Sequence, residues 1–173
     1  LRSRQGAPDG SKIFPVLMQA MHIVRQKLET RQPELIPVKI HAERATLLKT
    51  RWRGAASDGT EFGFDLHEPL RHGDAIHATG ECVYVIDQQP EPVLEVNISM
   101  TPAQATLLAW SIGNLHQPME IACGCVRVPD ESSLRSLLAN LGMPYKQTEA
   151  VFQPQGGPVR PHQHHHTEHA HHH

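Results

Sequence analysis

The sequence predicts an α+β protein in which an N-terminal all-β module precedes a βαββαβ module and a disordered His-rich C-terminal tail. Three observations carry this prediction. Short alternating segments separated by turn signals fill residues 35–87, helical periodicity takes over after residue 92, and eight of the 14 histidines lie between His162 and His173. The predicted divisions are a flexible leader at 1–12, a β-rich module at 13–87, a linker at 88–92, a second module at 93–154 and the tail at 155–173.

The composition narrows the class of protein. Sixteen Lys and Arg residues against 18 Asp and Glu give a net charge of −2, so the charge balance predicts no binding to nucleic acid or to a membrane surface. No apolar run approaches the roughly 18–20 residues that a membrane-spanning helix needs. Three cysteines are too few for a disulfide framework, which favours a reducing compartment. Residues 1–4 precede no apolar segment, so no secretory signal is predicted.

The N-terminal module is predicted to consist of short strands joined by hairpin turns. Basic and apolar side chains alternate through residues 48–53, which is the pattern of a half-buried strand. Asp58-Gly59 favours a hairpin turn into a second strand at 61–66, whose three apolar side chains share one face. Residues 13–27 have helix-like spacing, but an early proline and several β-branched residues leave helix and strand both open. Further elements are expected at residues 72–74 (a turn), 75–79 and 82–86 (two short strands).

The second module alternates strands with two amphipathic helices. A capping box at Thr101 and Gln104, with a proline between them, begins the first helix. Gly113 is predicted to end it as a left-handed cap, so that His116 opens the next strand. Asp130 is predicted to cap a second helix of the same period, which Gly142 ends. Strands at residues 93–98, 118–123, 125–128 and 146–152 complete the βαββαβ order of a ferredoxin-like module, with both helices on one face of the sheet.

The C-terminal tail is dominated by imidazole side chains. Its Gln-Gly-Gly-Pro start and its lack of an apolar period predict disorder. Neutral imidazole offers a lone pair near pH 7, so several imidazoles on a flexible chain can bind Ni²⁺, Zn²⁺ or Cu²⁺. A purification tag is the alternative interpretation, but the other residue types that interrupt the run favour a native metal-binding tail. The candidate ligands are His162, His164, His165, His166, His169, His171, His172 and His173.

Several short stretches resemble, in their order and spacing, the family of the urease accessory protein UreE. They lie at residues 49–53, 58–66, 70–74, 112–118 and 141–142, and the resemblance extends from about residue 44 to residue 152. It implies a cytoplasmic, homodimeric nickel metallochaperone that is not an enzyme. It further implies that the protein delivers Ni²⁺ to the urease apoprotein complex, together with the GTPase UreG, during assembly of the urease active site.

The resemblance singles out His116, because the Gly-Asn-x-His sequence at residues 113–116 matches the interfacial metal motif of that family. Without the resemblance, an ordinary surface histidine is the simpler interpretation. In a two-fold dimer each residue near the axis meets its own copy, so two copies of His116 would share one Ni²⁺ ion. Tail imidazoles or water would complete the shell. A site with so few fixed ligands would hold the ion weakly enough to release it.

Two further groups have competing interpretations. Cys123 and Cys125 would share a face and could chelate a metal if their segment were extended, whereas the commoner alternative is a hairpin tip with inert thiols. Lys49, Arg51 and Arg53 would project from one face of their strand. They would form either a solvated edge or a docking strip for an acidic partner.

Three classes of function therefore compete. The first is a nickel donor, and the second is a storage or buffering protein for Ni²⁺, Zn²⁺ or Cu²⁺ without a dedicated client. The third is an enzyme, but the sequence contains no nucleophile elbow, P-loop, dinucleotide fingerprint or HExxH motif. A hydrolytic metal site would also need three fixed ligands. A buffer needs only the tail, whereas a donor needs the ordered modules and a partner.

Overall fold

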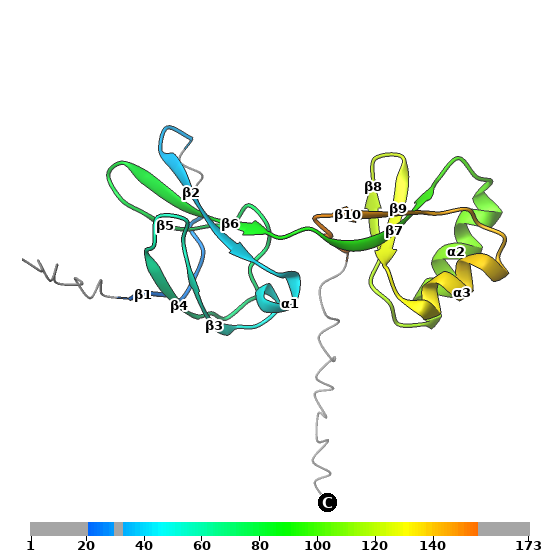
Figure 1. Ribbon diagram of the computed structural model, residues 1–173, viewed down its shortest axis with the longest axis horizontal. Coiled ribbons are helices and arrows are strands. Elements are labelled where there is room, and N and C mark those ends of the chain that lie inside the picture. Colours follow the sequence, from blue (N-terminus) through cyan, green and yellow to red (C-terminus); the bar gives the residue numbers. More distant parts are fainter. Residues whose placement is uncertain (1–20, 30–32, 156–173) are drawn as a thin grey trace, which may run out of the picture.

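The computed structural model describes residues 21–29 and 33–155. It has two lobes, each with its own hydrophobic core, and one extended segment joins them (Figure 1). The predicted leader, most of the segment at 13–27 whose conformation the sequence left open, and the tail from residue 156 lie outside the described residues.

The N-terminal lobe contains two three-stranded sheets. Their strand orders are β1-β4-β3 and β2-β6-β5, and the pairs β1–β4 and β2–β6 are parallel while the others are antiparallel. The apolar faces of the two sheets enclose a core that includes Ile40, Phe62, Phe64 and Ile86. The elements are β1 (His22–Val24), β2 (Ile36–Ala42), α1 (Arg44–Leu47), β3 (Arg51–Ala55), β4 (Glu61–Asp65), β5 (Ala75–Ala78) and β6 (Cys82–Gln88).

The hairpin signals of this lobe are confirmed, but the all-β prediction is wrong at α1. Gly59 has a φ of 89° in the turn between β3 and β4, as the Asp-Gly pair predicts. The strand expected from residue 48 begins only at Arg51. Leu48 instead closes the short helix α1, and the Lys49 N–H donates to the Thr46 carbonyl at 3.0 Å. Burial of Leu47 accounts for the helical turn at this point.

The second lobe is a four-stranded sheet with two helices. The strand order is β10-β7-β9-β8 and every neighbouring pair is antiparallel. Helices α2 and α3 lie together at one side of this sheet (Figure 1), and their apolar residues share one core with those of β7 and β9. The elements are β7 (Glu91–Asn97), α2 (Pro102–Asn114), β8 (Glu120–Ala122), β9 (Cys125–Pro129), α3 (Ser132–Asn140) and β10 (Lys146–Ala150), in the predicted βαββαβ order.

One predicted cap in this lobe is wrong. Glu131, not Asp130, occupies the N-cap position of α3, and its side chain accepts no capping hydrogen bond. The Asp130 carboxylate instead accepts two hydrogen bonds from Arg135, at 2.6 and 2.8 Å. Pairing with this guanidinium lowers the pKa of Asp130. A bidentate pair between an arginine and a carboxylate is stronger than a single hydrogen bond from a backbone N–H to the carboxylate. This explains why Asp130 pairs with Arg135 and why the N-cap lies one residue later than predicted.

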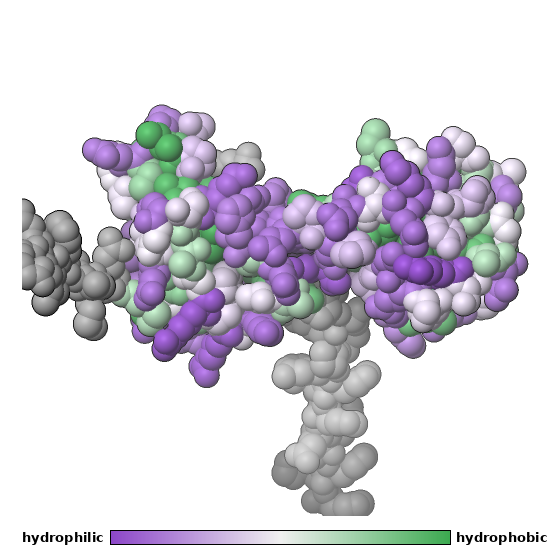
Figure 2. Space-filling model, viewed as in Figure 1, coloured by the Kyte–Doolittle hydropathy of each residue, from purple (hydrophilic) through white to green (hydrophobic). Residues whose placement is uncertain are grey.

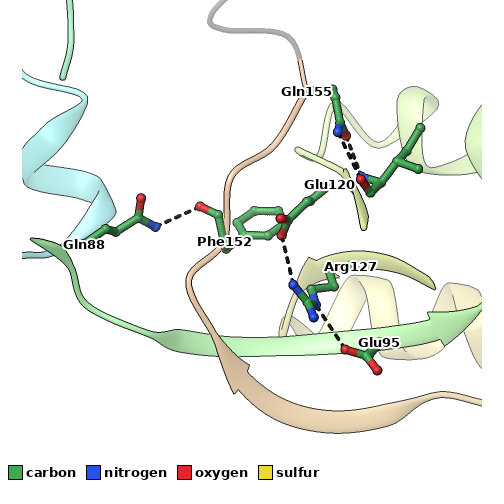
Figure 3. A network of polar contacts seen from close by, with 7 residues as sticks. Gln88, Glu95, Glu120, Arg127, Phe152 and Gln155 are labelled. Carbon is green, nitrogen blue, oxygen red and sulfur yellow. Dashed lines mark hydrogen bonds and ion pairs between the residues drawn. The ribbon is translucent and has the colours of Figure 1, made fainter. Parts of the chain in front are cut away.

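The segment predicted as a linker is largely structured. Strand β6 ends at Gln88 and β7 begins at Glu91, so the two strands run almost continuously from one lobe into the other (Figure 1). The buried Gln88 side chain donates to the Phe152 carbonyl at 2.8 Å (Figure 3). Arg44 of α1 donates to Glu91 at 2.6 and 3.0 Å, and its guanidinium lies 5.2 Å from the centre of the Phe152 ring. These contacts tie the two lobes at their junction.

The surface is mostly hydrophilic in the view of Figure 2, and hydrophilic residues gather where the two lobes meet. Smaller apolar patches lie on each lobe, including the tip of the hairpin formed by β8 and β9. The longest helix in the described part of the chain is α2, with 13 residues, so none of the helices there spans a bilayer.

Asp58 provides a test of how the two N-terminal sheets are joined. Its carboxylate accepts the Thr60 N–H at 2.9 Å and the Tyr84 hydroxyl at 3.0 Å, which links the β3–β4 turn to β6. The Thr60 hydrogen bond is the main cause that lowers the pKa of Asp58 below 3.8. A group whose pKa is lowered by folding stabilises the fold above its unfolded pKa, and that stabilisation is lost as the pH falls through the folded value.

We therefore expect Asp58→Asn to be less stable than the parent chain at pH 6, with the difference shrinking below pH 3.8 and disappearing once the pH has fallen through the lowered pKa of Asp58. Urea unfolding followed across this pH range measures the effect. Asp65→Asn is the matched control, because Asp65 lies in the same hairpin but pairs with the exposed Arg51. A difference between Asp58→Asn and the parent that stayed constant with pH would contradict the assignment.

Candidate metal-binding site

Helix α2 presents one face to the core and another to solvent. The predicted capping box is confirmed: Thr101 accepts the Gln104 N–H, and the Gln104 side chain accepts the Thr101 N–H, with Pro102 at the start of the helix. Leu108 and Ile112 are buried in the core of the second lobe. The helix therefore cannot rotate, and its opposite face stays in solvent.

That solvent face is apolar. Leu107 is 47% exposed and Trp110 is 64% exposed, and the i, i+3 spacing places them on the same face. Leu115, just past the end of the helix, is 41% exposed. This face was not among the features predicted from the sequence, although the spacing of Leu107 and Trp110 relative to Leu108 and Ile112 indicates it.

The end of α2 differs from the prediction. Gly113 lies inside the helix, which continues to Asn114 with Leu115 as its C-cap. His116 itself adopts the left-handed conformation, with a φ of 54°, and it is the only non-glycine residue with positive φ among those that the structure describes. The His116 N–H donates to the Gly113 carbonyl at 2.9 Å, and the Gln117 N–H donates to the Ile112 carbonyl at 3.4 Å. This is the Schellman arrangement, with the histidine in the left-handed position.

Helix α3 ends with the same arrangement and shows what the position normally contains. Gly142 has a φ of 63°, and its N–H donates to the Ala139 carbonyl at 3.0 Å. The Met143 N–H donates to the Leu138 carbonyl at 2.9 Å. A glycine occupies this position without strain, whereas a residue with a side chain costs about 1 kcal/mol or more. The histidine therefore stands at a strained position where glycine would fold more easily.

The surroundings of His116 suit a cation. The imidazole is exposed, and α2 directs the partial negative charge of its C-terminal carbonyls toward this end. The last turn of α2 contains no basic residue that would already offset this charge. Within residues 21–29 and 33–155, however, no group of three or more His, Cys, Asp or Glu side chains is placed to hold a metal ion. A metal at His116 would therefore be bound by fewer than three such side chains of the described part of this chain.

The last described residue lies along the strand that follows His116. The Gln155 N–H donates to the Met119 carbonyl at 3.0 Å. The Gln155 side-chain amide pairs with both backbone groups of Ile121: it accepts the Ile121 N–H at 2.5 Å and donates to the Ile121 carbonyl at 3.2 Å (Figure 3). The chain thus enters the His-rich segment from the edge of β8. No sequence pattern could have identified this contact, because it joins a side chain to a backbone 34 residues away.

Strand β8 is held in turn by a charged row on the sheet. Arg127 of β9 donates to Glu95 of β7 at 3.0 Å and lies 3.8 Å from Glu120 of β8 (Figure 3). The hydrogen bond to Glu95 is the main cause that raises the pKa of Arg127. The Arg127 guanidinium therefore links β7, β9 and β8. It helps to hold β8 in place, and β8 is the strand with which Gln155 forms its hydrogen bonds.

The two candidate cysteines occupy different environments. Ala122 pairs with Cys125, so Cys123 and Gly124 form the hairpin turn, with a φ of 80° at Gly124. The extended segment that chelation required is absent here, because residues 123–124 form the turn of a hairpin. Cys123 is exposed and Cys125 is buried. Burial is the main cause that raises the pKa of the Cys125 thiol, and the nearby Glu95 carboxylate adds to it, which disfavours the thiolate that binds metals.

The three predicted docking residues are exposed, but they do not form one strip on a strand. Arg51 and Arg53 belong to β3, whereas Lys49 precedes it. Arg51 donates to Asp65 of β4 at 2.8 Å. The two arginines border a shallow hollow whose floor is Gly63 of the central strand. Ile23 of β1 and Met21, which directly precedes β1, line the hollow on the other side of β4.

These features define a two-lobed α+β protein that presents an apolar helix face and a strained, exposed histidine to other molecules. Residues 91–173 match the family described as UreE urease accessory protein, C-terminal domain. A urease accessory protein UreE from Chelativorans sp. is 35% identical over 124 residues, which cover 68% of this chain and 78% of the relative.

Two Acinetobacter proteins with the same name are also similar. The one from Acinetobacter baylyi is 29% identical over 70% of this chain and 77% of its own length. The one from Acinetobacter baumannii is 27% identical over 84% of this chain and 92% of its own length. The chain belongs to the UreE family of urease accessory proteins.

The left-handed conformation of His116 predicts an unusual order of stabilities. His116→Gly removes the strain and should stabilise the fold by about 0.5–1 kcal/mol, whereas His116→Ala keeps a side chain at positive φ and should not. Thermal unfolding of the two variants and the parent measures the order. Gly142→Ala is the matched control at the equivalent position of α3 and should destabilise by about 1 kcal/mol. A His116→Gly variant no more stable than His116→Ala would contradict the left-handed assignment.

Proposed function

We propose that the protein is a nickel-binding metallochaperone that delivers Ni²⁺ to the urease maturation complex while the urease active site is assembled. Its membership in a family of urease accessory proteins supports a role in urease maturation. The observation that carries the nickel assignment is His116, a histidine at a left-handed helix end where glycine would be less strained. Strain of this kind persists where a side chain is required for another reason. The protein acts as a donor and not as a catalyst.

The ion is bound between two copies of the chain. His116 alone is a single ligand, and a two-fold axis near the end of α2 would supply the partner's imidazole. The exposed Leu107, Trp110 and Leu115 support this arrangement, because a dimer would bury apolar surface directly beside the histidine. Two imidazoles and water suit Ni²⁺, while Zn²⁺ and Cu²⁺ would also bind. Few fixed ligands make release to the acceptor possible.

The His-rich tail supplies further imidazoles to the same region. Gln155 fixes the start of the tail on β8, which begins four residues after His116. The first tail histidine, His162, follows seven residues later. A chain of seven residues reaches up to about 25 Å when extended. The tail histidines can therefore collect Ni²⁺ and pass it to the paired His116 site.

The proposal also covers the fold class of the second lobe, the partners of the protein and the roles of the remaining candidate residues. The second lobe is assigned to the ferredoxin-like class, which its strand order and its two crossover helices support. The partners are a second copy, the GTPase UreG and the urease apoprotein complex in the cytoplasm. The hollow beside Arg51 and Arg53 would dock an acidic segment of one of them, with Lys49 nearby. Cys123 and Cys125 remain secondary metal candidates, and the buried thiol of Cys125 weakens that role.

Nickel stoichiometry tests the proposal on a tail-stripped chain, which is the full-length protein with its eight tail histidines changed to serine. Equilibrium dialysis should find one Ni²⁺ for every two chains, because only the paired His116 site is retained. His116→Ala should remove this half-equivalent while the protein stays folded and dimeric. Trp110→Ser should also remove it, but by dissociating the dimer, which sedimentation velocity would show. Trp110 is largely exposed, so its loss should not disturb the core.

Two controls and one alternative sharpen the test. His67→Ala changes an exposed histidine of the N-terminal lobe, and Tyr145→Ser changes an exposed aromatic residue outside α2; neither should alter binding or assembly. Half-equivalent binding that survives His116→Ala would place the site elsewhere. If the tail-stripped chain binds no nickel and the parent chain binds several ions, the buffering alternative is correct. A nickel-dependent activation assay with the urease apoprotein then separates a donor from a store.

A further inference from the structure

Two histidines of the N-terminal lobe lie side by side at the junction of its sheets. His22 belongs to β1, the edge of one sheet, and His77 belongs to β5, the edge of the other. Their ring centroids are 4.9 Å apart and their planes are inclined by 36°. The His22 side chain is exposed, while that of His77 is half-buried. The fold thus brings together two imidazoles that are 55 positions apart in the sequence and that solvent can reach.

The two imidazole rings pack against buried aromatic side chains. The Phe62 ring lies 5.5 Å from His22 and 6.0 Å from His77, and the Tyr84 ring lies 5.8 Å from His77. Phe62 is fully buried and Tyr84 nearly so, and these positions fix the rings above them. Burial lowers the pKa of His77, and the neighbouring His22 lowers it further. A lowered pKa favours the neutral ring, which is the form whose lone pair can bind a metal.

The spacing of the rings matches that of two imidazoles on one ion. Metal–nitrogen bonds of about 2.0–2.1 Å place the centroids of two adjacent ligating rings roughly 4.5–5.2 Å apart in tetrahedral or square-planar sites. The observed 4.9 Å lies within this range. The two strands are held by pairing with β4 and β6, so the ligands are positioned before any metal arrives.

We propose that His22 and His77 form a second metal site, in the N-terminal lobe, that chelates one divalent ion of borderline softness. Cu²⁺ binds most tightly, followed by Ni²⁺ and Zn²⁺, with water in the remaining positions. The site holds one ion per chain and needs no dimer. It joins β1 to β5 across the two sheets, so the bound ion stabilises the fold. This inference does not rest on the nickel-donor proposal, because His116 lies in the other lobe.

A second histidine cluster in the same lobe is a weaker candidate. The Asp87 carboxylate lies 3.2 Å from His41 and 3.7 Å from His72. However, the Lys39 ammonium already lies 3.1 Å from the same carboxylate. The Nδ1 atom of His72 also accepts the Gln88 N–H at 3.1 Å, so that lone pair is occupied. A metal ion would have to displace both contacts, whereas the His22–His77 pair has no such cation beside it in the contacts that the structure describes.

The test uses copper sulfate and a full-length background chain that lacks the other proposed histidine ligands and the exposed thiol of Cys123, namely the tail-stripped chain with His116→Ala and Cys123→Ser. Calorimetry should find one Cu²⁺ per chain, and electron paramagnetic resonance should show nitrogen coupling from two imidazoles. His22→Phe and His77→Phe should each lower the affinity at least about tenfold, since each leaves a single imidazole. Cu²⁺ should raise the melting temperature of the background chain and leave that of either variant unchanged.

Phenylalanine keeps an aromatic ring at each position, so the melting temperature without metal shows that each variant is folded. His41→Phe is the matched control in the same lobe and should bind Cu²⁺ like the background chain. Equal Cu²⁺ affinity in the background, His22→Phe and His77→Phe chains would overturn the proposal, because the pair would then be a packing contact only. Loss of binding in His41→Phe alone would also overturn it and would place the site at Asp87.

Discussion

The packing of Leu108 and Ile112 against the sheet is the constraint on which the candidate site depends. Both side chains are almost fully buried, so helix α2 has one possible rotation about its axis. That rotation places Leu107 and Trp110 in solvent, and it determines on which side of the helix axis the chain continues to His116. The core therefore determines both the apolar face that a second copy would cover and the position of the proposed ligand. A helix packed through a different face would bury Trp110 and separate these two features.

The two helix ends of the second lobe show how the proposed function conflicts with stability. Both helices close with the same pair of backbone hydrogen bonds, but one has Gly142 at the left-handed position and the other has His116. The strain is a local cost that the folded protein carries at one position. In return, the imidazole stands beyond the last carbonyls of α2, where a cation is favoured by the helix dipole. Gln155 then brings the start of the His-rich segment to the neighbouring strand.

Local signals in the sequence predicted much of this fold. The capping box at Thr101, the turns at Gly59 and Gly142 and the βαββαβ order are confirmed, because each depends on neighbouring residues. The preference of glycine for positive φ predicts the left-handed residue at Gly113, whereas the Schellman bonds place it at His116. Contacts between distant segments, such as Gln88 with Phe152, left no pattern in the sequence. The same holds for the His22–His77 pair, which exists only because two sheet edges meet.

Paramagnetic broadening of backbone amide signals distinguishes Ni²⁺ bound at the end of α2 from Ni²⁺ bound only by the tail. The experiment adds less than one Ni²⁺ per two chains to the full-length protein and records which amides lose intensity. If Ni²⁺ is bound at the end of α2, signals from residues 113–121 and from Gln155 should disappear first, because these residues surround His116 and the start of the tail. Broadening confined to residues 156–173, with residues 113–121 still sharp, would contradict binding at the end of α2.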